Sequence, residues 1–361
     1  MVTFVTTPLV RRFAVRLGAI DQPNDRKVHA NPTPTLGGLA IFVGVLFAGV
    51  AARLMPDFEP AFTRSSAPIG ILAGAIVIFA LGAVDDLRDL PAPVKLAGQV
   101  FAAGILFLAG VKMQFVLLPN GVSYSLSDDV SVLVTVLWIV AMINAVNLVD
   151  GLDGLAAGIV AIAASAFFIY TLQLTQEGDF VGGSAAPLLA VMIAGVSLGF
   201  LRHNFFPARI FMGDSGSMLL GLILGAATVL GIGRAPPSLL SSSTQADVFL
   251  AYFPLLIPLA VILIPFTDAL LAVARRWRKK RSVFHADKEH LHHRLMDLGH
   301  GHKQAVIVMY IWSALAAGAG LAFTFLDPNE FIFILPVAVG ALVVYTLFPV
   351  LTKAIQDRLS L

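Results

Sequence analysis

Long apolar runs separated by short polar loops extend along the whole chain. Ten runs approach the roughly 20 residues that a helix needs to cross a bilayer. They cover residues 36–55, 68–84, 94–111, 130–148, 155–174, 185–201, 215–232, 247–273, 304–325 and 331–351. The opening stretch, 1–10, is apolar but half as long, and we count it as a further segment, truncated or partly inserted. The runs are continuous rather than alternating, so they predict helices and not a barrel.

We therefore predict an all-α fold: a polytopic membrane bundle of about 10–11 transmembrane helices, forming one integral membrane domain over residues 1–361. Composition agrees, because 58% of residues are hydrophobic and 13% charged, against about 25% charged in soluble domains. A net charge of +2 does not indicate nucleic acid. Without cysteine, disulfides and Cys-ligated metals are excluded. Arg11 and Arg12 follow the apolar start, which does not fit a cleavable signal peptide.

Basic residues gather on one side of the predicted topology. With alternating segments, the loops on one side hold 20 of the 24 Lys and Arg, and the opposite loops hold Arg53, Arg64, Lys112 and Arg234. The positive-inside rule assigns the basic side, and the C-terminus, to the cytoplasm. The N-terminus is then outside if the opening segment spans. All eight histidines also fall on the cytoplasmic side, which predicts that the active site faces it.

Two acidic motifs lie on that side. Asp85 and Asp86 end the segment 68–84, and membrane acids cost about 2.5–3.5 kcal/mol each at a helix centre. A divalent cation held by oxygen ligands would explain them; a solvated, helix-ending loop is the alternative. The second motif repeats polar residues at every third position, as Asn144, Asn147, Asp150 and Asp153. On a helix these residues form a slanting ladder. Its alternative is a turn with Asp caps.

Two further motifs complete the set. In FMGDSGS, Asp214 or Ser215 can cap the next helix, whose N-terminus would offer free N–H groups to a phosphate. The alternative is an ordinary cap without ligand, and Phe211 alone would be an interfacial aromatic. The fourth motif, HADKEHLHHR (285–294), follows a basic run that suits lipid headgroups. Its His, Lys and Arg suit phosphate or sugar hydroxyls; a zinc site is an alternative without cysteine support.

Together these residue types suit a diphosphate-bearing substrate and a lipid co-substrate. Several Asp residues beside a diphosphate would repel it. A bridging Mg²⁺ would remove that repulsion and stabilise phosphoryl transfer.

The order of VDDLRDL with Lys95, NAVNLVDGLDG, FMGDSGS and HADKEHLHHRL resembles the polyprenyl-phosphate N-acetylhexosamine-1-phosphate transferases (glycosyltransferase family 4). The resemblance covers about residues 8–303, and the last two segments, in 304–361, carry no motif. It implies a bacterial inner-membrane enzyme, multi-pass and Mg²⁺-dependent (Mn²⁺ would also serve). The lipid phosphate attacks a UDP-sugar, UMP leaves, and a lipid diphosphate-sugar forms, the first membrane step of a cell-envelope polysaccharide such as lipopolysaccharide, teichoic acid or arabinogalactan. A homodimer is compatible with the sequence.

The resemblance also implies roles for individual residues. Asp85 and Asp86 match the catalytic acids, with Asp85 activating the lipid phosphate, and Asn147 and Asp214 match the metal-binding positions. The matching substrate-binding positions are Lys27, Lys95, Asp150, Asp153, Phe211 (stacking on uracil), His290, His292, His293 and Arg294.

The His-Leu-His-His-Arg run favours UDP-GlcNAc over UDP-MurNAc-pentapeptide, because the pentapeptide transferases carry three consecutive histidines there. The phospho-MurNAc-pentapeptide transferase reading remains the nearest alternative. A membrane prenyltransferase with a DDxxD motif leaves GDSGS and the histidines unexplained. A transporter would place its charges near the midplane and show repeats.

Overall fold

The computed structural model describes residues 1–23, 32–117, 123–176, 185–232, 301–325 and short pieces of 336–346. Its described helices are α1 (Val2–Leu17), α2 (Gly38–Arg53), α3 (Glu59–Thr63), α4 (Ala67–Arg88), α5 (Ala92–Leu108), α6 (Asp128–Val149), α7 (Leu155–Gln176), α8 (Ala186–Asn204), α9 (Gly213–Ile232) and α13 (His302–Phe325). Strands β1 (Ile20–Asp21) and β2 (Thr33–Pro34) pair antiparallel, as do β3 (Phe115–Leu117) and β4 (Ser123–Ser125).

The all-α membrane prediction is confirmed. Each predicted segment from 36–55 to 215–232, and 304–325, coincides with a helix to within a few residues. Among the described residues, six helices are long and apolar enough to cross a membrane, and α2 with the bent stretch Pro56–Thr63 adds a seventh candidate. Segment 247–273 lies outside the described residues, and only pieces of 331–351 are described.

The first helix differs from its predicted bounds. Instead of ending after ten apolar residues, α1 continues through Arg11 and Arg12 to Leu17, where Gly18 closes it at φ 71°. The basic residues stay exposed while Val10 and Ala14 are buried, so one helix carries both a packed and a solvated face.

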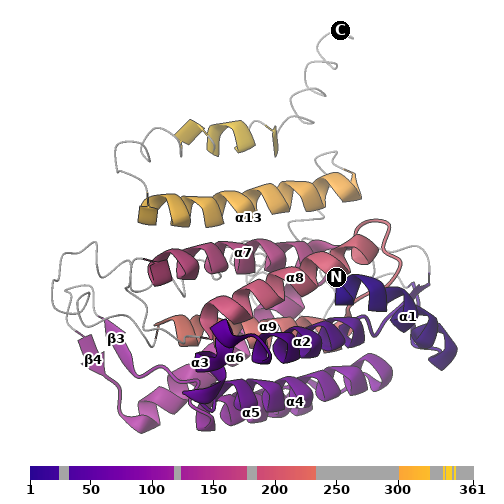
Figure 1. Ribbon diagram of the computed structural model, residues 1–361. Helices are drawn as coiled ribbons and strands as arrows, with labels where there is room; N and C mark the ends of the chain where they lie inside the picture. Colours follow the sequence, from indigo (N-terminus) through magenta and orange to yellow (C-terminus); the bar gives the residue numbers. More distant parts are fainter. Residues whose placement is uncertain are drawn as a thin grey trace, which may run out of the picture.

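The long helices lie side by side, with α13 against α7 at one edge and α4 and α5 at the other (Figure 1). Helix α9 is the centre, since it contacts α2, α4, α6 and α8, and every residue from Ser215 to Gly231 is buried. The β3–β4 hairpin and α1 lie at opposite ends of the bundle (Figure 1).

Glycines allow α9 to approach its neighbours closely. A Cβ added at Gly82 of α4 would stand 2.5 Å from the backbone nitrogen of Ser215, and one at Gly221 would stand 2.6 Å from the Cα of Ile143 in α6. Close backbone approach at small residues is the usual way in which membrane helices gain packing contacts.

We expect Gly82→Ala to push α4 away from α9 and to destabilise the protein, because overpacking costs about 1–3 kcal/mol. Thermal unfolding of the detergent-purified protein measures the effect. Gly104→Ala on α5 is the matched control, since a Cβ there meets nothing within 4 Å. Equal melting temperatures for both variants would contradict the tight α4–α9 contact.

Candidate active site

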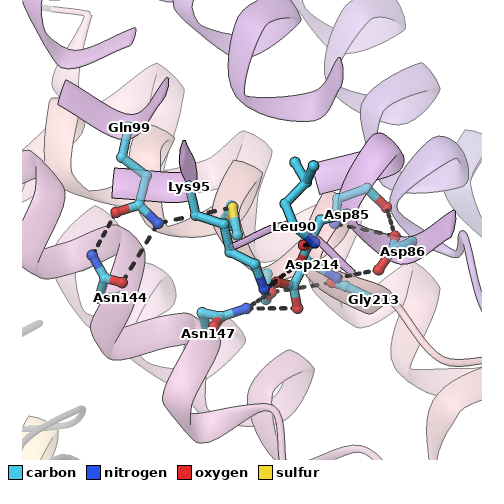
Figure 2. Close-up of polar contacts among 12 residues, drawn as sticks. Asp85, Asp86, Leu90, Lys95, Gln99, Asn144, Asn147, Gly213 and Asp214 are labelled. Carbon is cyan, nitrogen blue, oxygen red and sulfur yellow. Dashed lines mark hydrogen bonds and ion pairs between the residues drawn. The ribbon is translucent and has the colours of Figure 1, made fainter. Parts of the chain in front are cut away.

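Residues of three sequence motifs meet in one cluster (Figure 2), where α4 and α6 end and α5 and α9 begin. Asp85 and Asp86 lie in the last turn of α4, Asn147 in the last turn of α6 and Asp214 in the first turn of α9, while Lys95 extends from the start of α5. The helices that carry them are distant in sequence, so only their packing around α9 assembles the cluster.

Lys95 forms the centre of the cluster. Its Nζ lies 2.5 Å from Asp85 Oδ2 and 3.2 Å from Asp214 Oδ2. The Asp85 side chain is 5% exposed, and those of Lys95 and Asp214 are 25% and 28% exposed. One ammonium therefore faces two carboxylates in a partly enclosed place, and a net negative charge remains to attract a second cation.

Asp85 is oriented by its own turn. Its Oδ1 accepts a hydrogen bond of 2.7 Å from the backbone N–H of Leu90. The chain can fold back in this way because Asp89 leaves the helix in the left-handed region, at φ 52°. The other oxygen of Asp85 is thereby directed to Lys95.

Asp214 is held from a second side by α6. Asn147 Nδ2 donates to Asp214 Oδ1 at 3.0 Å and to Ser217 Oγ at 2.9 Å. Ser217 in turn donates to the carbonyl oxygen of Gly213. Asp214 is thus fixed by a cation and an amide. Side chains from α4, α5 and α6 all reach this residue at the start of α9.

Asp86 has a different environment from Asp85. Its Oδ1 accepts from the backbone N–H of Asp214 at 2.7 Å, and its Oδ2 accepts from the N–H and the hydroxyl of Ser215 at 3.3 and 2.7 Å. The prediction that Asp214 or Ser215 caps α9 and leaves these N–H groups free for a phosphate is wrong. A carboxylate from the neighbouring helix already occupies that position.

A pair of amides, Gln99 buried and Asn144 half-buried, lies one turn deeper. Asn144 Nδ2 donates to Gln99 Oε1 at 2.7 Å, and Gln99 Nε2 donates back at 3.4 Å (Figure 2). Gln99 follows Lys95 by one turn of α5, and Asn144 precedes Asn147 by one turn of α6. The pair therefore sets the spacing of α5 and α6 beneath the cluster. Sequence reasoning missed Gln99, although a glutamine inside an apolar run is a signal.

The loop after α6 is joined to the loop before α9. Asp153 Oδ2 accepts from the N–H of Ala208 at 2.9 Å, and Asn204 accepts from the N–H of Gly154 while donating to the carbonyl of Ile210. The predicted nucleotide-sugar acid Asp153 thus also bridges two loops. No role was predicted for Asn204 from the sequence.

Helix α13 carries no motif but contacts both of these loops. Tyr310 donates to the carbonyl oxygen of Gly154 at 2.5 Å, and His302 stacks on Phe206 with ring centroids 4.5 Å apart. The sequence signal that could have identified Tyr310 is a tyrosine within an apolar membrane segment.

Phe211 is half-buried at the same end, with its backbone joined to Pro34 and Gly37 by hydrogen bonds of 2.9 Å. Its stacking on uracil stays a prediction. Lys27, His290, His292, His293 and Arg294 lie outside the described residues.

Asp150 follows α6 directly and lies outside the membrane-spanning helix. Burial raises the pKa of its carboxyl well above the usual value, and the negative charges of Asp214, Asp86 and Asp153 raise it further. A cation nearby would stabilise the ionised form of this carboxyl.

The described residues hold no ready-made metal cage: among them, no three His, Asp or Glu side chains are grouped to hold an ion. They do bring two carboxylates and an amide together. Mg²⁺ typically takes one or two carboxylates and completes its shell with water and substrate phosphates, so the donor set fits that metal.

Known proteins resemble the chain over most of its length. Residues 68–232 match the model of glycosyl transferase family 4. The decaprenyl-phosphate N-acetylglucosaminephosphotransferase of Mycolicibacterium smegmatis is 41% identical over 98% of this chain and 87% of its own length. The probable undecaprenyl-phosphate N-acetylglucosaminyl 1-phosphate transferase of Bacillus subtilis is 36% identical over 86% and 79%. An undecaprenyl-phosphate alpha-N-acetylglucosaminyl 1-phosphate transferase of Yersinia pestis is 28% identical over 87% and 79%.

Asp150→Asn should raise thermal stability more as the pH rises. The folded protein binds the Asp150 proton more tightly than the unfolded chain, so its stability falls as pH rises from about 3.8 through the raised pKa. Asparagine removes this loss. We expect little difference in melting temperature from the wild type near pH 4 and an increasing advantage toward pH 8, without added divalent metal. A difference independent of pH would contradict the raised pKa.

Proposed function

The chain belongs to glycosyl transferase family 4, and from this membership we propose that it transfers GlcNAc-1-phosphate from UDP-GlcNAc to a polyprenyl phosphate. The products are polyprenyl-diphosphate-GlcNAc and UMP. The observation that carries the proposal is the cluster of Asp85, Lys95, Asn147 and Asp214, which the packing of the four apolar helices α4, α5, α6 and α9 assembles at one end of the bundle. Relatives named for this reaction match 98% and 86% of the chain.

The reaction requires a bond between two anions. An oxygen of the lipid phosphate attacks the β-phosphorus of UDP-GlcNAc, the bond from that phosphorus to the bridging oxygen of UMP breaks, and UMP leaves with its electron pair. In this proposal Asp85 activates the lipid phosphate by taking its remaining proton, for which its Oδ2 faces the cluster centre. Lys95 then pairs with phosphate oxygens in place of the carboxylates.

We propose Mg²⁺, with Mn²⁺ as a substitute, as the metal. When bound, it neutralises the phosphate oxygens and stabilises the charge that develops on them. Asp214 would hold it, with Asn147 as the second ligand. Asn147 at present offers its NH₂ to Asp214, and a half-turn of its amide would offer the oxygen instead.

The remaining residues are proposed to bind the substrate. Asp150 and Asp153 would face the nucleotide sugar, Phe211 would stack on uracil, and His290, His292, His293, Arg294 and Lys27 would grip the sugar and its phosphates. We propose that the active site faces the cytoplasm. The loops on that side of the predicted topology hold most of the basic residues, and a water-soluble UDP-sugar can reach the site from the cytoplasm. The product would enter cell-envelope polysaccharide synthesis.

A UMP-release assay tests the function. Purified protein in detergent, given UDP-GlcNAc and a polyprenyl phosphate, should release UMP only with Mg²⁺ or Mn²⁺ present. UDP-MurNAc-pentapeptide, the substrate of the alternative reaction, should give far less. UMP release from the pentapeptide substrate alone would replace the proposed sugar, and no UMP with either substrate would refute the transferase.

Asp85→Asn and Asp214→Asn should each lower turnover by roughly 100-fold or more, since each removes a charge that acts on the transferring phosphate. Both proteins should still elute as folded monodisperse species. Asp129→Asn is the control, an exposed acid at the opposite end of α6. Wild-type rates in either active-site variant would remove that carboxylate from the proposed mechanism.

A further inference from the structure

The adjacent acids Asp85 and Asp86 point to different partners. Asp85 faces Lys95 and the N–H of Leu90, whereas Asp86 takes three donors from the start of α9. Both oxygens of Asp86 are engaged in these hydrogen bonds. Among the described residues, Asp86 forms no hydrogen bond or ion pair with Lys95 or Asn147.

The backbone is shaped to admit the Asp86 carboxylate. Gly213 has φ +67°, and an added Cβ there would overlap that carboxylate, so the position requires glycine on two grounds. Gly82, one turn before Asp86, touches the backbone of Ser215. The carboxylate is thus pressed against the first turn of α9, where unpaired N–H groups and the helix dipole favour a negative charge.

Held in this way, the start of α9 determines where Asp214 lies. The N–H that Asp86 binds at 2.7 Å belongs to Asp214 itself, and the Asp214 side chain meets Lys95 and Asn147 at 3.2 and 3.0 Å. A shift of the first turn would carry Asp214 away from both partners at once.

We propose that Asp86 is a positioning residue: it caps α9 from α4 and thereby holds Asp214 in the cluster. This rests on the proposed function only for its effect on turnover. Asp85 is then the one member of the acidic pair that meets the reacting groups, and Asp86 acts through Asp214.

Hydrogen exchange of the full-length protein in nanodiscs tests the cap without any assay of activity. The peptide covering the first turn of α9 should exchange about tenfold faster in Asp86→Ala, as expected for a lost N-cap. Asp86→Asn keeps one acceptor and should show a smaller increase, and Ser215→Ala, which keeps both N–H donors, a smaller one still. Asp89→Asn is the matched control: it removes an exposed acid from the same turn, and asparagine tolerates the left-handed backbone there.

Metal dependence of UMP release tests the link to Asp214. Asp86→Asn should need about tenfold more Mg²⁺ for half-maximal turnover and recover much of its rate at saturating metal, whereas Asp85→Asn should not recover. Wild-type exchange in both Asp86 variants would overturn the cap. Faster exchange without recovery at saturating metal would overturn a purely positioning role. Because exchange is read without substrate, the cap is still tested if the chain transfers another sugar or none.

Discussion

The contact of Lys95 with two carboxylates is the interaction on which the rest of the site depends. Asp85 and Asp214 come from different helices and are both largely withdrawn from water, so their charges would repel without a cation between them. Breaking a buried ion pair by removing one partner costs about 3–5 kcal/mol. Lys95 therefore supplies, from within the protein, the positive charge that holds the two carboxylates together.

That arrangement requires α9 to lie at the centre of the bundle. A helix that is buried from Ser215 to Gly231 can present its first turn to several neighbours, and α4, α5 and α6 each supply one residue to that turn. Glycines at the contacts let the backbones approach closely. The polar tie between Gln99 and Asn144 lies beneath the cluster, where membrane packing alone would leave the spacing of α5 and α6 less defined.

The loops after α6 and before α9 are also held by side chains from other segments. Asp153, Asn204 and Tyr310 satisfy backbone groups of two irregular segments that would otherwise be unpaired at the end of an apolar bundle. A residue that the sequence predicts to bind substrate can therefore also form a hydrogen bond that stabilises a loop. Asp153 is an example: it was predicted from its motif to bind the nucleotide sugar, and its carboxylate accepts a hydrogen bond from the N–H of Ala208.

The sequence by itself determined the membrane helices, because the length and continuity of an apolar run are local properties and the bilayer sets their threshold. It also determined the residue types of the site: Asp85, Asn147 and Asp214 were named from their motifs and do meet. Only the tertiary structure decided which contacts each of these residues makes. The tertiary structure decides which N–H groups donate to Asp86, and it decides that Gln99 and Tyr310 support the site. Both depend on which helices pack side by side and on how each helix is rotated about its axis. No periodicity within one segment encodes that, because the partner of each polar group lies on another helix.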